Sequence, residues 1–110
     1  MANYIKIKED GNRLEFSETY KPVVCGNSNY FVIFDFSEEW FNCDEKTAVF
    51  IIGDKKKMKK FRGHVLQLPV FPNAPYVSLL VHTKKDDEYF TTSAIKIRLE
   101  PTPIGDLLNV

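Results

Sequence analysis

The residues of this chain favour extended structure so strongly that an all-β fold constrains every other interpretation. Val, Ile, Phe, Tyr, Trp and Thr account for 38 of the 110 residues, whereas Ala and Leu together account for only 12. β-branched and aromatic side chains pack well on a pleated surface, and helices favour alanine and leucine. We therefore predict an antiparallel β-sandwich, immunoglobulin-like or jelly-roll-like, of about seven to nine short strands with at most one short helical turn.

The chain opens with a predicted hairpin. Asn3–Lys8 and Arg13–Phe16 alternate polar and apolar residues, and Asp10, Gly11 and Asn12 between them are typical of a turn. This alternation would place four apolar side chains on one face: Ile5, Ile7, Leu14 and Phe16.

The rest of the chain predicts further short strands in a meander. The strands are expected at Tyr30–Phe36, Thr47–Ile52, Lys55–Phe61, Gly63–Leu68, Tyr76–His82, Tyr89–Thr92 and Ala94–Leu99. The third and fourth of these would form a lysine-rich hairpin, and Ser37–Trp40 would form the helical turn. Three prolines exclude a regular strand between Leu68 and Tyr76: Pro69, Pro72 and Pro75. Trp40 and Phe50 are expected to anchor the core.

Length and charge indicate a single globular domain, residues 1–100, followed by a proline-containing tail, residues 101–110. Fifteen Lys and Arg balance fifteen Asp and Glu, so no net field attracts nucleic acid, and nucleic acid is not an expected partner. No apolar segment approaches the ~20 residues of a membrane span, and the N-terminus lacks a signal sequence. We expect a protein made in the cytoplasm that does not enter a membrane.

No motif for catalysis or metal binding is evident. His64 and His82 lack the spacing of a metal site, and Cys25 and Cys43 are expected to be thiols in a reducing compartment. One acidic group could include a glycosidase-like pair, but acidic residues around a turn are typical of a solvated surface: Asp35, Glu38, Glu39, Asp44 and Glu45. We expect a protein that is not an enzyme and that uses no cofactor and no metal.

The strongest local charge lies in the segment 55–62. Six of its eight residues are basic: Lys55, Lys56, Lys57, Lys59, Lys60 and Arg62. On a strand these side chains would alternate between two faces rather than line one groove. Two interpretations remain open, because lysines protect an edge strand from pairing with other chains and can equally contact a protein or a nucleic acid.

Four short segments, taken in order, resemble a known structural module. They are Val24–Tyr30 (VCGNSNY), Phe34–Trp40 (FDFSEEW), Lys46–Phe50 (KTAVF) and Thr91–Ile95 (TTSAI). The order is similar to that of the N-terminal β-sandwich in tail or baseplate proteins, of the upper-baseplate type, from phages and prophages of Gram-positive bacteria. The resemblance covers roughly residues 20 to 100. It implies a virion protein, made in the bacterial host cytoplasm, that anchors to the particle through this module.

Members of that family usually continue into a linker and a coiled coil that carries receptor-binding parts, whereas this sequence stops ten residues after Glu100. A free-standing adaptor and an anchoring fragment are both compatible with that departure. The expected partners are other phage structural proteins and further copies of the chain, with a trimer as one arrangement. The expected contacts are the acidic turn (Glu38, Glu39, Asp44 and Glu45), the basic segment, and the apolar tail residues Ile104, Leu107 and Leu108. The alternative function is a small phage-encoded inhibitor of a bacterial defence nuclease, of the anti-CRISPR kind, that binds through charged faces.

Overall fold

The alternating segments at the start of the chain form the predicted hairpin. The computed structural model describes residues 3–24, 29–37, 45–71 and 74–100. Strands β1 (Asn3–Asp10) and β2 (Arg13–Phe16) pair antiparallel around Gly11 and Asn12, whose φ angles of 56° and 66° match a type I′ turn. The four apolar side chains predicted to share a face point inward: Ile5, Ile7 and Leu14 are buried and Phe16 is half-buried.

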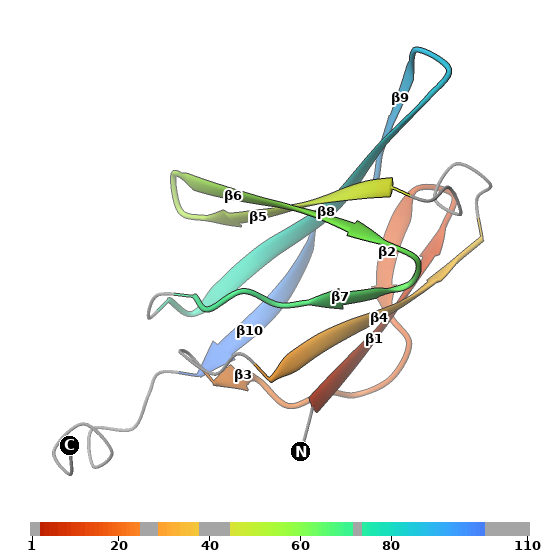
Figure 1. Cartoon of the computed structure of the whole chain (residues 1–110). Helices are drawn as coiled ribbons and strands as arrows, with labels where there is room; N and C mark the ends of the chain where they lie inside the picture. Colours follow the sequence, from red (N-terminus) through yellow and green to blue (C-terminus); the bar gives the residue numbers. More distant parts are fainter. Residues whose placement is uncertain (1–2, 25–28, 38–44, 72–73, 101–110) are drawn as a thin grey trace, which may run out of the picture.

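The strands assemble into two sheets. The four-stranded sheet has the order β2-β1-β4-β7, with β4 at Tyr30–Phe36 and β7 at Val65–Gln67. The six-stranded sheet has the order β3-β10-β8-β5-β6, with β9 also paired to β8. Its strands are β3 (Val23–Val24), β5 (Glu45–Ile52), β6 (Lys55–Arg62), β8 (Tyr76–Lys85), β9 (Glu88–Thr91) and β10 (Ile95–Glu100). Figure 1 shows the two sheets facing each other, with β1 and β4 opposite β8 and β10.

This architecture confirms the predicted all-β, sandwich-like fold and corrects three details. The described residues contain ten strands, because the two-residue β3 adds to those predicted, and they contain no helix. The sheets are mixed rather than antiparallel, since β1 pairs parallel with β4 and β3 pairs parallel with β10. The strand order is also not a meander. Between β1 and β4 the chain crosses to the other sheet at β3 and returns, and such a crossover is what a parallel pair requires.

The predicted lysine-rich hairpin is wrong, because its two halves belong to different sheets. β6 pairs with β5, whereas β7 pairs with β4. The chain turns the corner at Gly63 and His64, where Gly63 takes a φ of 70° that other residues rarely adopt. The backbone N–H of Phe34 donates to the carbonyl of His64 at 2.8 Å, and the Phe34 and Phe61 rings stack 5.5 Å apart. The corner therefore closes one side of the sandwich.

The opposite side is closed by side chains at the edge of β10. The Tyr20 hydroxyl accepts a hydrogen bond from the Arg98 backbone N–H at 3.1 Å and donates to the Lys96 carbonyl at 3.4 Å. The Arg98 guanidinium lies over the Tyr20 ring, 5.0 Å from its centre. Before the start of β10, the Ser93 N–H donates to the Asn12 carbonyl at 2.8 Å and so connects the β1–β2 turn to the six-stranded sheet. Tyr20 thus satisfies backbone groups of β10 that β3 is too short to reach.

The inward faces of both sheets form one apolar core. Val32, Phe50, Leu66, Leu79 and Ile97 are fully buried in it. Phe50 was predicted as a core anchor and is confirmed, whereas Trp40, most of the predicted helical turn, both cysteines and the tail lie outside the described residues. Beyond this core, β8 and β9 continue as a two-stranded arm that projects past the other strands (Figure 1).

Candidate functional site

Strand β6 distributes its basic residues between two faces, as the sequence predicts. In the pairing with β5, Lys46 lies opposite Phe61, and both are buried. Phe61 therefore points inward, to the core. Lys56, Met58 and Lys60 have the opposite parity on β6, so they point outward, and all three are exposed. The basic segment is therefore not one continuous cationic groove.

Half of the basic segment is engaged within the chain. Lys60 Nζ and Arg62 Nη2 lie 3.6 and 3.7 Å from the Glu45 carboxylate. Lys59 Nζ donates to the Gln67 carbonyl at 3.0 Å and so links β6 to β7. Edge protection, one of the two interpretations of this segment, fits the position of β6 as the last strand of the six-stranded sheet, where lysines disfavour pairing with another chain.

The other half of the basic segment has no such contacts. Within the described ranges, the side chains of Lys55, Lys56 and Lys57 make no ion pair and no hydrogen bond. All three are exposed. They line an open pocket of about 260 Å³ together with four apolar residues: Phe50, Ile52, Val70 and Phe71. At this end of the sandwich, three exposed cations without an ion-pair partner among the described residues therefore lie beside apolar surface.

The outward face of the six-stranded sheet carries an apolar row across three strands. Val49 of β5 lies opposite Met58 of β6 on one side and opposite Leu80 of β8 on the other. Met58 is 68% exposed, and Val49 and Leu80 are half-buried on a face that no other strand of the described residues covers. The row is flanked by Lys60 and Lys56, so it is an apolar stripe with a basic margin. We call Val49, Met58 and Leu80 the outer stripe.

The outward face of the four-stranded sheet carries a second apolar group. The Tyr4 and Phe31 rings are 5.7 Å apart, and Tyr4 is 56% exposed. Ile33 lies opposite Val65, which is 50% exposed. Lys8 and Asp35 lie opposite each other on the same face, so charge there is mixed rather than uniformly basic.

The two histidines occupy separate places. His64 lies in the corner between the sheets, and its ring is 5.8 Å from the Phe36 ring. His82 lies within β8, not at its end as expected, because β8 continues into the arm to Lys85. Its Nδ1 is 2.8 Å from the Thr91 hydroxyl and its ring stacks on Tyr89 at 5.4 Å. No group of three potential metal ligands is found among the residues that the structure describes.

The acidic residues predicted to cluster are only partly within the described ranges. Asp35 is exposed on the four-stranded sheet, and Glu45 is paired with Lys60 and Arg62 on the other sheet. The structure therefore does not bring these two carboxylates onto one face. The remaining predicted contact residues lie outside the described residues: Glu38, Glu39, Asp44, Ile104, Leu107 and Leu108.

Sequence reasoning missed two buried charged residues. Glu9 is 1% exposed and accepts hydrogen bonds from the backbone N–H of Asn12 at 2.9 Å and of Ser37 at 3.0 Å. Lys46 is also 1% exposed, and its ammonium lies 5.2 and 5.4 Å from the centres of the Phe36 and Phe61 rings. Both could have been found from alternation, since Glu9 follows Ile5 and Ile7 at a spacing of two, and Lys46 precedes Phe50 at the same parity.

Comparison with protein-family models, with curated proteins and with solved structures finds no match to this chain. Among the described residues, no helix is long and apolar enough to cross a bilayer.

Proposed function

We propose that this protein is a non-enzymatic structural module of a bacteriophage particle, in the tail or baseplate, that acts through protein–protein contacts. The observation that carries the proposal is the outer stripe, because apolar residues on three neighbouring strands form a surface that no other part of the described chain covers. Exposed apolar patches on small domains are typical of protein-binding sites. The resemblance of the ordered segments to a phage module supplies the particle as the setting.

The position of the stripe suits a module that is repeated in an assembly. The stripe runs across three paired strands, and its β6 end lies between Lys56 and Lys60, which favour a partner with acidic groups around an apolar centre. Each contact of this size is modest, but the symmetry of a particle multiplies it. The chain needs no large interface of its own to be held in place.

Replacing Met58 with glutamate tests the contribution of the stripe. Because Met58 is 68% exposed, the change should leave folding intact while placing a charge in the apolar contact. We expect co-sedimentation of the tagged protein with gradient-purified particles to fall by about tenfold or more, equivalent to at least ~1.4 kcal/mol of binding free energy.

The matched control is Val65→Glu, which makes the same kind of change at a 50% exposed position on the other sheet. It should co-sediment like the unmodified protein. Equal incorporation of the Met58 variant and the unmodified protein would contradict a role for the outer stripe. Thermal unfolding of both variants verifies that neither change acts through stability.

A further inference from the structure

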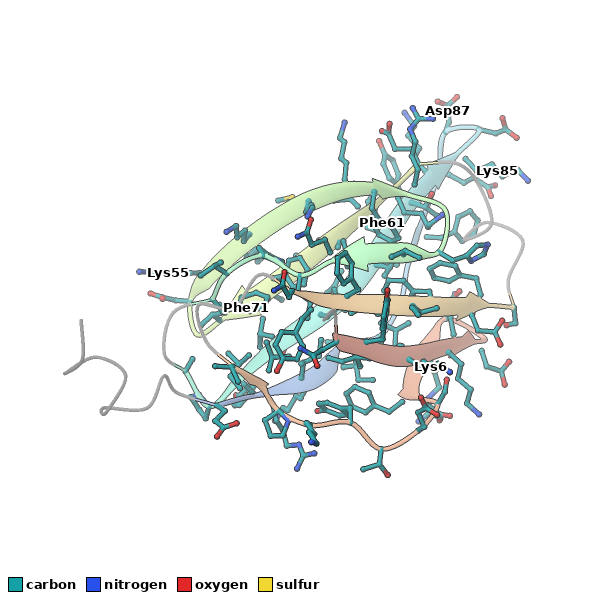
Figure 2. The ribbon with its side chains drawn as sticks, turned by 60° about the horizontal axis from the view of Figure 1, so that its bottom comes forward. Lys6, Lys55, Phe61, Phe71, Lys85 and Asp87 are labelled. Carbon is teal, nitrogen blue, oxygen red and sulfur yellow. The ribbon has the colours of Figure 1, made fainter. Side chains whose placement is uncertain are left out.

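The pocket at the β5–β6 turn has an apolar floor that is already ordered by the core. Phe50 is fully buried and meets Phe71 edge to face, with ring centres 5.4 Å apart. Phe71 is 4% exposed, Ile52 is half-buried, and Val70 is 50% exposed at the margin. Together they line an open space of about 260 Å³. Figure 2 shows Lys55 and Phe71 at the same end of the molecule, away from Lys85 and Asp87 in the arm.

The register explains why cations surround this pocket. Lys57 lies opposite Phe50 and Lys55 opposite Ile52, so both lysines share the inward parity of the buried Phe61. At this end of β6 the inward face meets residues 69–71 instead of a strand of the second sheet, and the lysines remain exposed at the margin of the pocket. Exposed cations this close together repel one another, and an anionic ligand would relieve that repulsion.

We propose that this pocket binds one apolar side chain of a partner protein whose neighbouring residues are acidic. The inference rests on the proposed function, because it assumes a protein as the partner, and it adds a second, chemically defined contact to the outer stripe. The apolar side chain would contact Ile52, Val70 and the edge of Phe71. Its acidic neighbours would pair with Lys55 and Lys57.

The size and surface of the pocket favour a protein segment over other anionic ligands. An open space of about 260 Å³ is smaller than the cavities that enclose free small molecules, but it suits a single anchoring side chain in a protein interface. A nucleic acid would pair with the lysines through phosphate, and its bases need exposed aromatic faces for stacking. Phe50 and Phe71 are 0% and 4% exposed, so they offer no such face.

The test uses a short fluorescein-labelled peptide with a leucine–phenylalanine centre and aspartates on both sides, measured by fluorescence anisotropy with the full chain. We expect saturable binding that weakens about tenfold or more in the double variant Lys55→Ser/Lys57→Ser. The control double variant Lys8→Ser/Lys21→Ser removes the same charge from exposed positions outside the pocket and should bind within about twofold of the unmodified chain.

A second variant keeps the result interpretable if the lysine changes disturb β6. Val70→Glu places a carboxylate at the pocket margin, where it competes for the lysines, and the half-exposed position tolerates a charge. Like the lysine double variant, it should weaken binding of the peptide about tenfold or more. Retained binding in the Val70 variant would overturn the proposal.

Three comparison probes separate the proposal from its rivals. A peptide with serines in place of the two central apolar residues, and one with lysines in place of the aspartates, should both bind about tenfold more weakly or worse. Equal binding of either peptide would overturn the proposal, as would tighter binding of a single-stranded oligonucleotide. If the chain binds the peptide but is absent from particles, the pocket is a peptide-binding site and the proposed function is wrong. If the chain is present in particles but does not bind the peptide, the proposed function stands and the pocket proposal is wrong.

Discussion

Replacing Phe50 with alanine should lower the free energy of unfolding by ~3 to 5 kcal/mol. Phe50 is fully buried in β5, lies opposite Leu79 in β8 and meets the Phe71 ring edge to face. Truncation removes the apolar surface of the ring and leaves a cavity between β5 and Phe71. Urea unfolding monitored by tyrosine and tryptophan fluorescence measures the change.

The control for this variant is Phe31→Ala. Phe31 is the same residue type on a neighbouring sheet, but it is half-buried on the outward face and contacts the exposed Tyr4. Its loss should cost about 1 kcal/mol, since only part of the ring leaves a protein environment. If the two variants were equally stable, the assignment of Phe50 to the centre of the core would be wrong.

Small domains have a total stability of about 5–15 kcal/mol, so the loss expected for Phe50→Ala is a large part of it. The midpoint temperature of thermal unfolding of this variant should therefore lie well below that of the unmodified protein.

Replacing Glu9 with glutamine should destabilise the protein by roughly 1 to 3 kcal/mol, although the two side chains have nearly the same shape. The two carboxylate oxygens accept hydrogen bonds from different backbone donors, Asn12 and Ser37. An amide has only one oxygen, so its NH₂ group must face one of these N–H donors. A neutral glutamine costs less to bury than a carboxylate, but this gain is smaller than the loss of a charge-assisted hydrogen bond. One of the two backbone N–H groups, of Asn12 or of Ser37, is left without an acceptor in a place that water does not reach.

The same chemical change at Glu15 provides the comparison. Glu15 lies on β2 and forms an exposed ion pair with Lys8 at 3.7 Å, with both side chains 51% exposed. Exposed pairs contribute little, so Glu15→Gln should change the unfolding free energy by less than about 1 kcal/mol. Chemical denaturation of both variants in parallel tests the difference. A Glu9 variant as stable as the Glu15 variant would show that the buried carboxylate does not hold the β1–β2 turn against the end of β4.

Local patterns predicted the strands well, because strand formation depends on the alternation of neighbouring residues. The segments at 3–8, 13–16, 30–36 and 47–52 all lie within observed strands, and the glycine-containing turn at Gly11 lies where it was expected. Pairing between distant strands was not predictable in the same way. Nothing near Asn3 or Tyr30 in the sequence indicates that β1 and β4 run parallel side by side, since that pairing depends on the crossing of the chain to the second sheet at Val23–Val24.

The error at the lysine-rich segment has a specific physical cause. Gly63 and His64 form the kind of short glycine turn that usually joins two paired strands, so a hairpin was the natural prediction. Here Phe61 must reach the core beside Phe34, and Leu66 must pair with Val32 across the corner. The burial of these four apolar side chains places β6 and β7 in different sheets, and only the three-dimensional packing reveals this arrangement.

The basic part of the candidate site could be predicted from the sequence, and the apolar part could not. The basic segment was identified as the main charge feature, and the division of its side chains between two faces follows from the period of a strand. The apolar part was not predictable, because Val70 and Phe71 lie in a proline-containing segment without periodicity and reach Phe50 only through the fold. The outer stripe likewise depends on the register that sets Met58, Val49 and Leu80 in one row.

The proposed role in a phage particle is tested most directly by quantitative peptide mass spectrometry of gradient-purified particles, from a lysate of the cells that encode this chain. We expect stoichiometric recovery with the particle, at a copy number consistent with threefold or sixfold symmetry relative to the major capsid protein. Abundance in the soluble extract together with absence from the particles would contradict a structural role, and it would favour the defence-nuclease inhibitor instead.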